Sequence, residues 1–313
     1  MSPREEAPPR AAGIPSLQYK TWVTKLSRRI LYHAADSPRL GTLVLRTPRL
    51  ARAARHAADR YLGGETLEQA VATIDRLHTE GFAAAIDSFG EAATDRERIE
   101  ETVARYLDVN CVLAQLKPPV NVWVDLSNLG LDISSDLCLE SVERIVQTLP
   151  EGALLQVRAH DSSRTDRILD IALGLAVDGA PVMATLQAHL RRSPEDAHRL
   201  IAAKVPVLLV KGTTLEPSDV AYPWGEQTDV AFLALAHELH AGGVQLAIGT
   251  HDPVLREALL ATLDGIDVEM LLGVRPEDGR DLLHRGHRVR IYVPFGLDWF
   301  RYWVRRLGEA RGA

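Results

Sequence analysis

The residues best suited to chemistry stand near the C-terminus, where residues 290–310 read RIYVPFGLDWFRYWVRRLGEA. On a helix that begins near Leu297, four polar residues fall at i, i+3, i+4 and i+7 and therefore share one face. Two adjacent guanidinium groups can grip a carboxylate or a phosphate with paired hydrogen bonds. This face is either an anion clamp or, as the alternative, a solvated basic surface. The four residues are Tyr302, Arg305, Arg306 and Glu309.

The elements that must position such a clamp form a regular series along the chain. Eight short, mostly apolar runs are each followed by a helical pattern, as in βα units, and runs of this kind are typical of parallel strands covered on both faces. Eight units without an obvious sheet edge predict a (β/α)8 barrel. A doubly wound open sheet is the alternative, but no glycine-rich fingerprint follows the first run. The runs occupy residues 82–90, 121–127, 154–160, 181–187, 206–212, 244–251, 268–274 and 289–296.

In a barrel of this type the chemistry lies at the carboxyl ends of the strands, so the polar residues that close each run are the candidate site residues. Brought to one mouth, they would lie beneath the helix that carries the paired arginines. Each could also be a satisfied polar residue of the barrel rim. The candidates are Asp87, Asp125, Arg158, Gln187, Lys211, Thr250 with His251, and Tyr292.

The bulk properties exclude several classes of protein. The chain has 313 residues, 46% of them hydrophobic, and a net charge of −6, which argues against a nucleic-acid-binding protein. No apolar run is long enough to span a membrane. The two cysteines and eleven histidines form no metal-ligand spacing, so we predict no metal and a cytoplasmic location. We expect a disordered leader over residues 1–16, helical segments over 17–62 and the barrel over 63–313.

Several of these segments resemble the proline dehydrogenase family. The ending VRIYVPFGLDWFRYWVRRLGEA is similar to that family's closing strand and helix, and its tyrosine and paired arginines are the most specific part. GGETLEQAVATIDRLHTEGFAAAIDSFGE is similar to its entry helix and first strand, and NVWVDLSNLGLDIS to its second. VMATLQAHLRR, LLVKGTTLEP and LAIGTHDP are similar to its fourth, fifth and sixth strands. The likeness runs in order over roughly residues 60 to 310.

The resemblance implies an FAD-containing barrel that takes a hydride from the carbon beside the ring nitrogen of L-proline, or of a related cyclic or secondary amino acid. The product of proline would be pyrroline-5-carboxylate, and the electrons would pass to a membrane quinone. By position, Arg305 and Arg306 would clamp the substrate carboxylate, Tyr292 and Tyr302 would wall the ring, and Leu271 would pack against it. The positions matching flavin contacts are Gln187, Val210, Lys211, Thr250, His251 and Glu309.

Two departures from the family pattern are reciprocal. Asp125 ends the second strand where the family has a lysine, and Arg158 ends the third where it has an aspartate. We predict that the positive and negative members of this charge pair have exchanged strands. Arg158 would join the carboxylate clamp, and Asp125 would neutralise Arg305 or Arg306.

Other departures favour a second hypothesis. Leu208 stands where the family has a flavin-contacting arginine, Thr214 where it has an active-site tyrosine, and His189 where it has an aromatic residue. The alternative is a divergent relative that keeps the clamp but has another substrate or no redox chemistry. The arginines in residues 46–60 allow a peripheral membrane contact, with a solvated helix face as the alternative.

Overall fold

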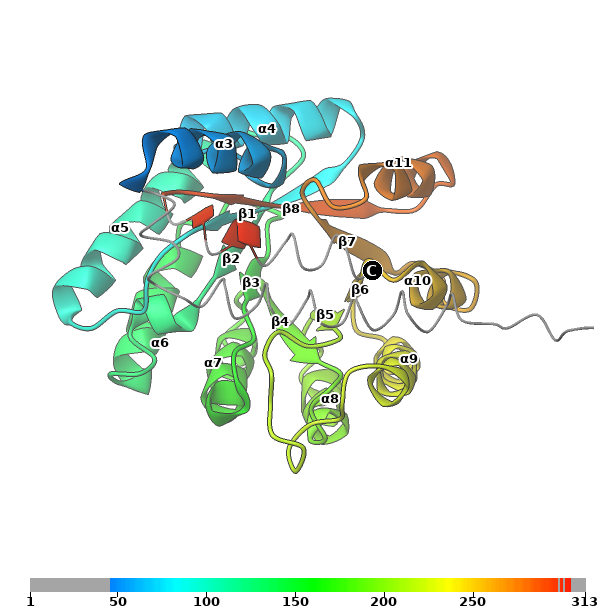
Figure 1. Cartoon of the computed structure of the whole chain (residues 1–313). Helices are drawn as coiled ribbons and strands as arrows, with labels where there is room; N and C mark the ends of the chain where they lie inside the picture. The colour runs from blue at the N-terminus through cyan, green and yellow to red at the C-terminus, as the bar shows by residue number, and fades with distance from the viewer. Residues whose placement is uncertain (1–45, 298, 301, 305–313) are drawn as a thin grey trace, which may run out of the picture.

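The computed structural model describes residues 46–297, 299–300 and 302–304. Eight parallel strands follow one another around a closed barrel in chain order, and helices surround them (Figure 1). The predicted (β/α)8 barrel is confirmed. The strands are β1 (Ala83–Ser88), β2 (Asn121–Val124), β3 (Leu155–Val157), β4 (Val182–Gln187), β5 (Val207–Val210), β6 (Leu246–Gly249), β7 (Asp267–Leu271) and β8 (Val289–Phe295).

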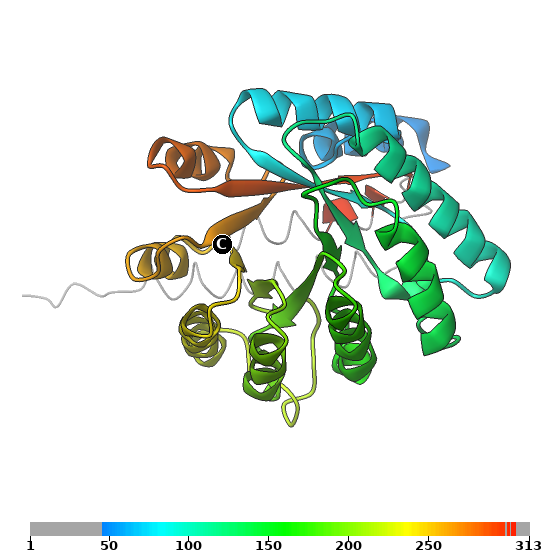
Figure 2. The ribbon, with the colours of Figure 1, turned by 180° about the vertical axis from the view of Figure 1, so that it is seen from behind.

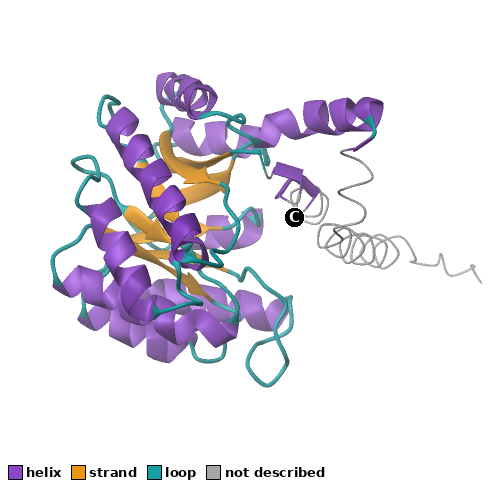
Figure 3. Ribbon diagram, turned by 90° about the vertical axis from the view of Figure 1, so that its left-hand side faces the viewer, coloured by secondary structure: helices purple, strands orange, loops and turns teal. Residues whose placement is uncertain are grey.

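The helices form an outer layer that encloses the strands, as views from behind and from the side show (Figures 2 and 3). Several begin at side-chain caps that the sequence supplies at strand-to-helix turns. Asp252 caps α10, and Ser134 caps α6. The helices are α3 (Pro48–Ala58), α4 (Leu67–Thr79), α5 (Arg96–Leu113), α6 (Ser135–Val146), α7 (Thr165–Val177), α8 (Ser193–Ala202), α9 (Glu226–Ala241), α10 (Pro253–Leu260) and α11 (Pro276–His284), with short 3-10 turns η1 (Asp59–Tyr61), η2 (Leu126–Leu129) and η3 (Ser162–Arg164).

The barrel closes between its first and last strands. Six residues of β1 pair in parallel with β8, from Ala83 opposite Arg290 to Ser88 opposite Phe295. Because side chains alternate along a strand, one set from each strand packs under the helices and the other points into the barrel. The interior carries an apolar floor below the carboxyl-end mouth, and we call it the barrel floor. It consists of Ala85, Trp123, Met183, Leu208, Ala247 and Tyr292.

Next to this floor the barrel interior holds a set of buried polar residues, which we call the interior network. The Glu269 carboxylate accepts hydrogen bonds from Trp123 Nε1 at 3.1 Å and from Gln156 Nε2 at 2.9 Å. Arg290 lies 3.8 Å from Glu269 and 3.4 Å from Asp267. All five residues are buried. Burial raises the pKa of Glu269, although Arg290 and the two hydrogen bonds oppose the shift.

The chain also packs its two described ends against each other. Trp299, Phe300 and Val304 are helical and form a buried cluster with Ala54 and Ala58 of α3. The predicted leader at 1–16, most of the predicted segment 17–62, and residues 305–313 lie outside the described residues. Within the described ranges, no helix combines the length and apolar character needed to cross a membrane.

Candidate active site at the barrel mouth

A partly buried ion pair joins the first and third strands at the mouth. Arg158 follows β3 directly and donates hydrogen bonds to the carboxylate of Asp87, at the end of β1, and to the Tyr292 hydroxyl at 2.9 Å. The same Tyr292 hydroxyl donates to Asp87. The guanidinium carbon of Arg158 also lies 5.3 Å from the centre of the Trp123 ring, which is within the range of a cation–π contact. Arg158 is therefore held by a carboxylate, a phenol and an indole.

Burial and charge shift the titration of this group. Burial raises the pKa of Asp87, and the charge of Arg158 only partly opposes this. For Arg158 burial acts to lower the pKa, but the charges of Asp87, Tyr292 and Asp125 and the hydrogen bond with Tyr292 together outweigh it and hold the pKa well above its usual range. Burial also raises the pKa of the Tyr292 phenol. At neutral pH the guanidinium is charged and the phenol is protonated, so the phenol can donate to Asp87.

A second carboxylate, that of Asp125, follows β2 and lies beside this pair. Asp125 accepts hydrogen bonds from the Ser127 amide at 2.9 Å and the Ser127 hydroxyl at 2.6 Å. His160 Nε2 lies 2.9 Å from both of its oxygens, and Arg158 Nε lies 3.8 Å away. Burial acts to raise the pKa of Asp125, but the hydrogen bond and charge of His160 and the charge of Arg158 hold it below its usual range. Asp125 is therefore ionised.

We refer to Asp87, Asp125, Arg158, His160 and Tyr292 as the mouth cluster. The structure brings Asp125 and Arg158 together, as neighbouring parallel strands require. It gives Arg158 a partner, Asp87, that the predicted charge exchange did not include. The two carboxylates and one guanidinium carry a net charge of −1 when His160 is neutral. The paired arginines of the predicted clamp, Arg305 and Arg306, and the flavin-contact candidate Glu309 lie outside the described residues.

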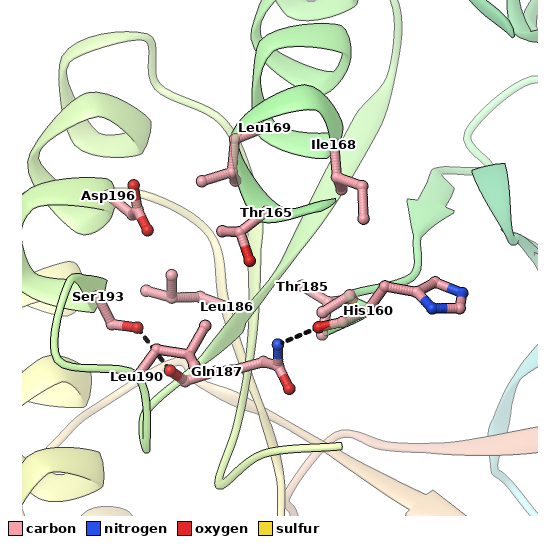
Figure 4. A pocket seen from close by; sticks show the side chains of 11 residues that line it. His160, Thr165, Ile168, Leu169, Thr185, Leu186, Gln187, Leu190, Ser193 and Asp196 are labelled. Carbon is pink, nitrogen blue, oxygen red and sulfur yellow. Dashed lines mark hydrogen bonds between the residues drawn. The ribbon is translucent and has the colours of Figure 1, made fainter. Parts of the chain in front are cut away.

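The other side of the mouth carries the remaining predicted positions. The Gln187 amide donates to the His160 carbonyl at 2.7 Å and accepts from the Thr213 amide at 2.8 Å and the Thr213 hydroxyl at 2.7 Å. Figure 4 shows Gln187 and His160 side by side, beside a small pocket under α7 and α8. Lys211 Nζ lies 2.7 Å from Asp229 and 3.0 Å from Asp252. Both side chains are thus fixed by protein partners.

Strands β6, β7 and β8 complete the ring of candidates. The Thr250 hydroxyl accepts from the Asp252 amide at 3.1 Å, and His251 Nε2 accepts from the Leu271 amide at 3.2 Å. Leu271, Val210 and Tyr302 all pack against the barrel floor. The Tyr302 ring lies 6.2 Å from the Tyr292 ring, so these two residues do share one corner of the mouth. The described candidates therefore surround a single opening.

Comparison with known proteins assigns this barrel to a family. The family model for proline dehydrogenase matches residues 70–313.

The chain belongs to the proline dehydrogenase family.

Curated relatives agree with this assignment. Proline dehydrogenase 1 of Bacillus subtilis (strain 168) is 30% identical over 263 residues, covering 82% of this chain and 87% of the relative. The proline dehydrogenase of Deinococcus radiodurans is 30% identical over 266 residues, covering 80% and 86%. The predicted membership of this oxidoreductase family is confirmed.

Solved structures show the same fold. Proline utilization A from Bdellovibrio bacteriovorus, inactivated by N-propargylglycine, superimposes with a TM-score of 0.74 at 16% identity, over 94% of this chain. The chain spans only 37% of that larger protein.

Within the proline dehydrogenase family, the unusual residues of this chain have specific surroundings. Leu208 is buried in the barrel floor. The Thr214 hydroxyl donates to Glu216 at 2.8 Å, and Glu216 in turn accepts from the amide and hydroxyl of Ser162. His189 is buried and stacks on Trp224 with ring centres 5.4 Å apart.

Sequence reasoning missed His160 and Trp123. His160 closes the run 154–160, two residues beyond Arg158, but β3 ends at Val157, so strand alternation does not extend to the turn in which His160 lies. Trp123 lies in the apolar run 121–127, and alternation from Asp125 places it on the same face of β2.

Proposed function

We propose that the chain is an FAD-dependent dehydrogenase that oxidises L-proline, or a related cyclic or secondary amino acid, to the corresponding imine. For L-proline the product is pyrroline-5-carboxylate, and a quinone is the proposed electron acceptor. The observation that carries the proposal is the family match over residues 70–313, which includes the whole mouth of the barrel. A cytoplasmic protein with peripheral contact to the quinone-bearing membrane is the location we propose.

The walls of the mouth support a flavin on the side of β4 to β6. The barrel floor there is apolar, because Met183, Leu208 and Ala247 form it. The Thr185 hydroxyl on β4 is buried without a hydrogen-bond partner among the described residues, as expected of a group that meets a polar ligand. Gly249 adds no side chain where β6 reaches the mouth. These features fit FAD.

The residues proposed to hold FAD are Gln187, Val210, Lys211, Thr250, His251 and Glu309. When bound, FAD supplies the acceptor for the hydride. Lys211 is the cation on this side, and its contacts with Asp229 and Asp252 fix its position. With Leu208 replacing an arginine, we expect weaker cofactor retention than in a protein with a second cation at the floor.

The β1 to β3 side is the proposed substrate side. Arg305 and Arg306 are the proposed carboxylate clamp, with Tyr292, Tyr302 and Leu271 as walls around the carbon skeleton. Arg158 adds a fixed positive charge on this side of the mouth. Holding the carboxylate fixes the reacting carbon, and such positioning can contribute several kcal/mol to lowering the barrier. We propose that Arg158 and Asp125 are the exchanged members of the family's charge pair.

The test is an absorbance spectrum of the purified protein between roughly 300 and 550 nm, before and after anaerobic addition of L-proline. We expect flavin bands that bleach with L-proline. Arg158→Met should slow the bleaching by about 100-fold or more, because it removes a positive charge from the substrate side. Arg144→Met is the matched control, since Arg144 pairs with Glu100 on the exposed surface.

Each other result has a distinct meaning. Bands that persist with L-proline but bleach with another cyclic or secondary amino acid would keep the flavoenzyme and change the substrate. No flavin bands after incubation with excess FAD would contradict the proposal and favour a carboxylate-binding barrel without redox chemistry. Leu208 and Thr214 are the observations that favour this second function.

A further inference from the structure

The proposed reaction requires a proton to leave the substrate nitrogen. A secondary amino acid at neutral pH carries an ammonium group, whose nitrogen has no free electron pair. The hydride can leave the neighbouring carbon only when that pair is available to form the C=N bond. A protein base near the nitrogen would therefore accelerate the reaction below the pKa of the amine.

Most polar groups at the mouth cannot act as this base, because their lone pairs or charges already take part in hydrogen bonds or ion pairs. Arg158 cannot lose its proton at any ordinary pH, and Asp87 is enclosed by Arg158 and Tyr292. Tyr292 uses its proton to bond Asp87. Lys211 is already paired with the carboxylates of Asp229 and Asp252.

His160 has the arrangement of a base. Its Nε2 faces both oxygens of Asp125 at 2.9 Å, so the neutral ring carries its proton on Nε2 and keeps the lone pair on Nδ1. Among the residues that the structure describes, Nδ1 makes no hydrogen bond. The side chain is 27% exposed, and Figure 4 shows the ring turned away from Thr165, Leu169 and Ser193 of the neighbouring pocket.

Two further contacts hold the ring in place. Gln187 donates a 2.7 Å hydrogen bond to the His160 carbonyl and so ties the turn after β3 to the end of β4. Ser127 donates twice to Asp125 and fixes the carboxylate on the other side of the ring. The orientation of the imidazole therefore depends on three strands rather than on a free loop. This carboxylate–imidazole pairing is the arrangement that sets the tautomer of a general base in many enzymes.

We propose that His160, oriented by Asp125, takes the proton from the substrate ammonium before the hydride leaves. This inference rests on the proposed function. In this step an N–H bond of the substrate breaks, an Nδ1–H bond forms on His160, and the electron pair stays on the substrate nitrogen. No oxidation occurs in it. Asp125 remains ionised and stabilises the imidazolium, and water takes the proton from His160 later in the cycle.

The charged groups that face His160 come from several elements. Asp125 follows β2 and stabilises the imidazolium, while Arg158 follows β3 and opposes it. Asp161, the next residue in the chain, is close enough for its own pKa to be lowered in part by His160. Of these three, only Asp125 is in direct contact with the ring.

The experiment compares the pH profiles of kcat/KM with L-proline for the wild type, His160→Gln and Asp125→Asn. The wild-type profile should reach a plateau below the pKa of the amine. In H160Q only the free amine reacts, so the profile should rise about tenfold per pH unit toward the pKa of the amine. The loss relative to wild type should be about 100-fold at pH 7 and should shrink as the pH rises. D125N should show a smaller loss with the same trend.

A second histidine–carboxylate pair provides a matched control. His198 lies 2.6 Å from Glu238 between α8 and α9, with its side chain 70% exposed. H198Q should keep the wild-type profile. Flavin content, read from the absorbance of each purified variant, should be equal, and added imidazole should raise the rate of His160→Ala at neutral pH.

Three outcomes would contradict the inference. If H160Q loses the same factor at every pH, or loses nothing, His160 is not the base and the proposed function stands. The role of His160 is structural if three results hold together. H160Q has wild-type activity at high pH, its profile keeps a plateau, and imidazole does not rescue H160A. If the wild type itself fails to reduce its flavin with any cyclic or secondary amino acid, the proposed function and the inference fall together.

Discussion

The mouth cluster and the interior network place similar side chains in different settings. Each combines an arginine with two carboxylates, an aromatic ring and a further polar side chain. In the interior network all members are sealed, and Arg290 is 7% exposed. In the mouth cluster the side chains of Arg158, His160 and Asp125 are 32%, 27% and 19% exposed. The mouth cluster is thus accessible enough to contact a ligand, whereas the side chains of the interior network contact only one another.

This difference follows the direction of the strands. The carboxyl ends of barrel strands open to the active-site side, whereas residues nearer the amino ends stabilise the barrel. Glu269 and Arg290 lie opposite each other in the β7–β8 register, two residues before Leu271 and Tyr292. We therefore expect substitutions in the interior network to act on stability and substitutions in the mouth cluster to act on turnover.

The strongest test of the interior network is Glu269→Leu. The change leaves the Trp123 indole and the Gln156 amide without an acceptor and removes a partner of Arg290. We expect the free energy of unfolding to fall by about 3 to 5 kcal/mol, measured by urea denaturation. Glu269→Gln keeps an acceptor oxygen and should therefore lower the free energy of unfolding by less.

Arg144→Ala is the control for burial, because Arg144 and Glu100 form an exposed pair with side chains 40% and 46% accessible. Its effect should stay below about 1 kcal/mol. If E269L and R144A had equal effects, the interior network would contribute no more than a surface ion pair.

The mouth cluster is tested by restoring the charge order of the family. Arg158→Asp places a third carboxylate beside Asp87 and Asp125, and we expect KM for L-proline to rise by about 100-fold. Asp125→Lys should raise KM less, because Asp87 still faces both cations, Arg158 and the introduced lysine. The double variant R158D/D125K should recover KM to within about tenfold of the wild type.

In the double variant kcat should stay low if Asp125 orients His160. A double variant whose KM is no better than that of R158D would show that the two substitutions are not one exchanged pair.

A smaller effect is expected from the pH dependence of stability. The pKa of Asp125 is lower in the folded protein than in the unfolded chain, so its stabilising contribution is present above the unfolded value and is lost as the pH falls below about 4. Asp125→Asn should cost about 1 to 3 kcal/mol near pH 7 and progressively less in acid, measured by urea unfolding at several pH values. A gap between the two proteins that stayed constant down to pH 3 would contradict this assignment.

The sequence predicted the strands well because their pattern is local. All eight runs overlap a strand, and in seven of them the strand ends before the run does, whereas β4 and its run both end at Gln187. The proximity of Asp125 and Arg158 was also predictable, since consecutive parallel strands are neighbours in a barrel. These inferences need only chain order and alternation.

The partners of these residues were not predictable in the same way. Asp87 reaches Arg158 across β2, from a strand that is not its neighbour, and this contact depends on the radius of the closed barrel. His160 lies in a turn whose backbone conformation has no periodic signal. Glu269 did carry a signal, as a charged residue inside an apolar run, but only the register with Arg290 shows which charge accompanies it.

The pairing of β1 with β8 has a consequence for how the protein is made. Asp87 and Tyr292, which share a hydrogen bond, are separated by 205 residues in the chain. At about 5 to 20 residues per second, a ribosome needs about 10 to 40 seconds to add the last strand after the first. Throughout that time β1 has one uncovered edge, and long-range pairing of this kind is slow to form. The nascent barrel therefore depends on its helices, or on chaperones, to shield that edge until β8 emerges.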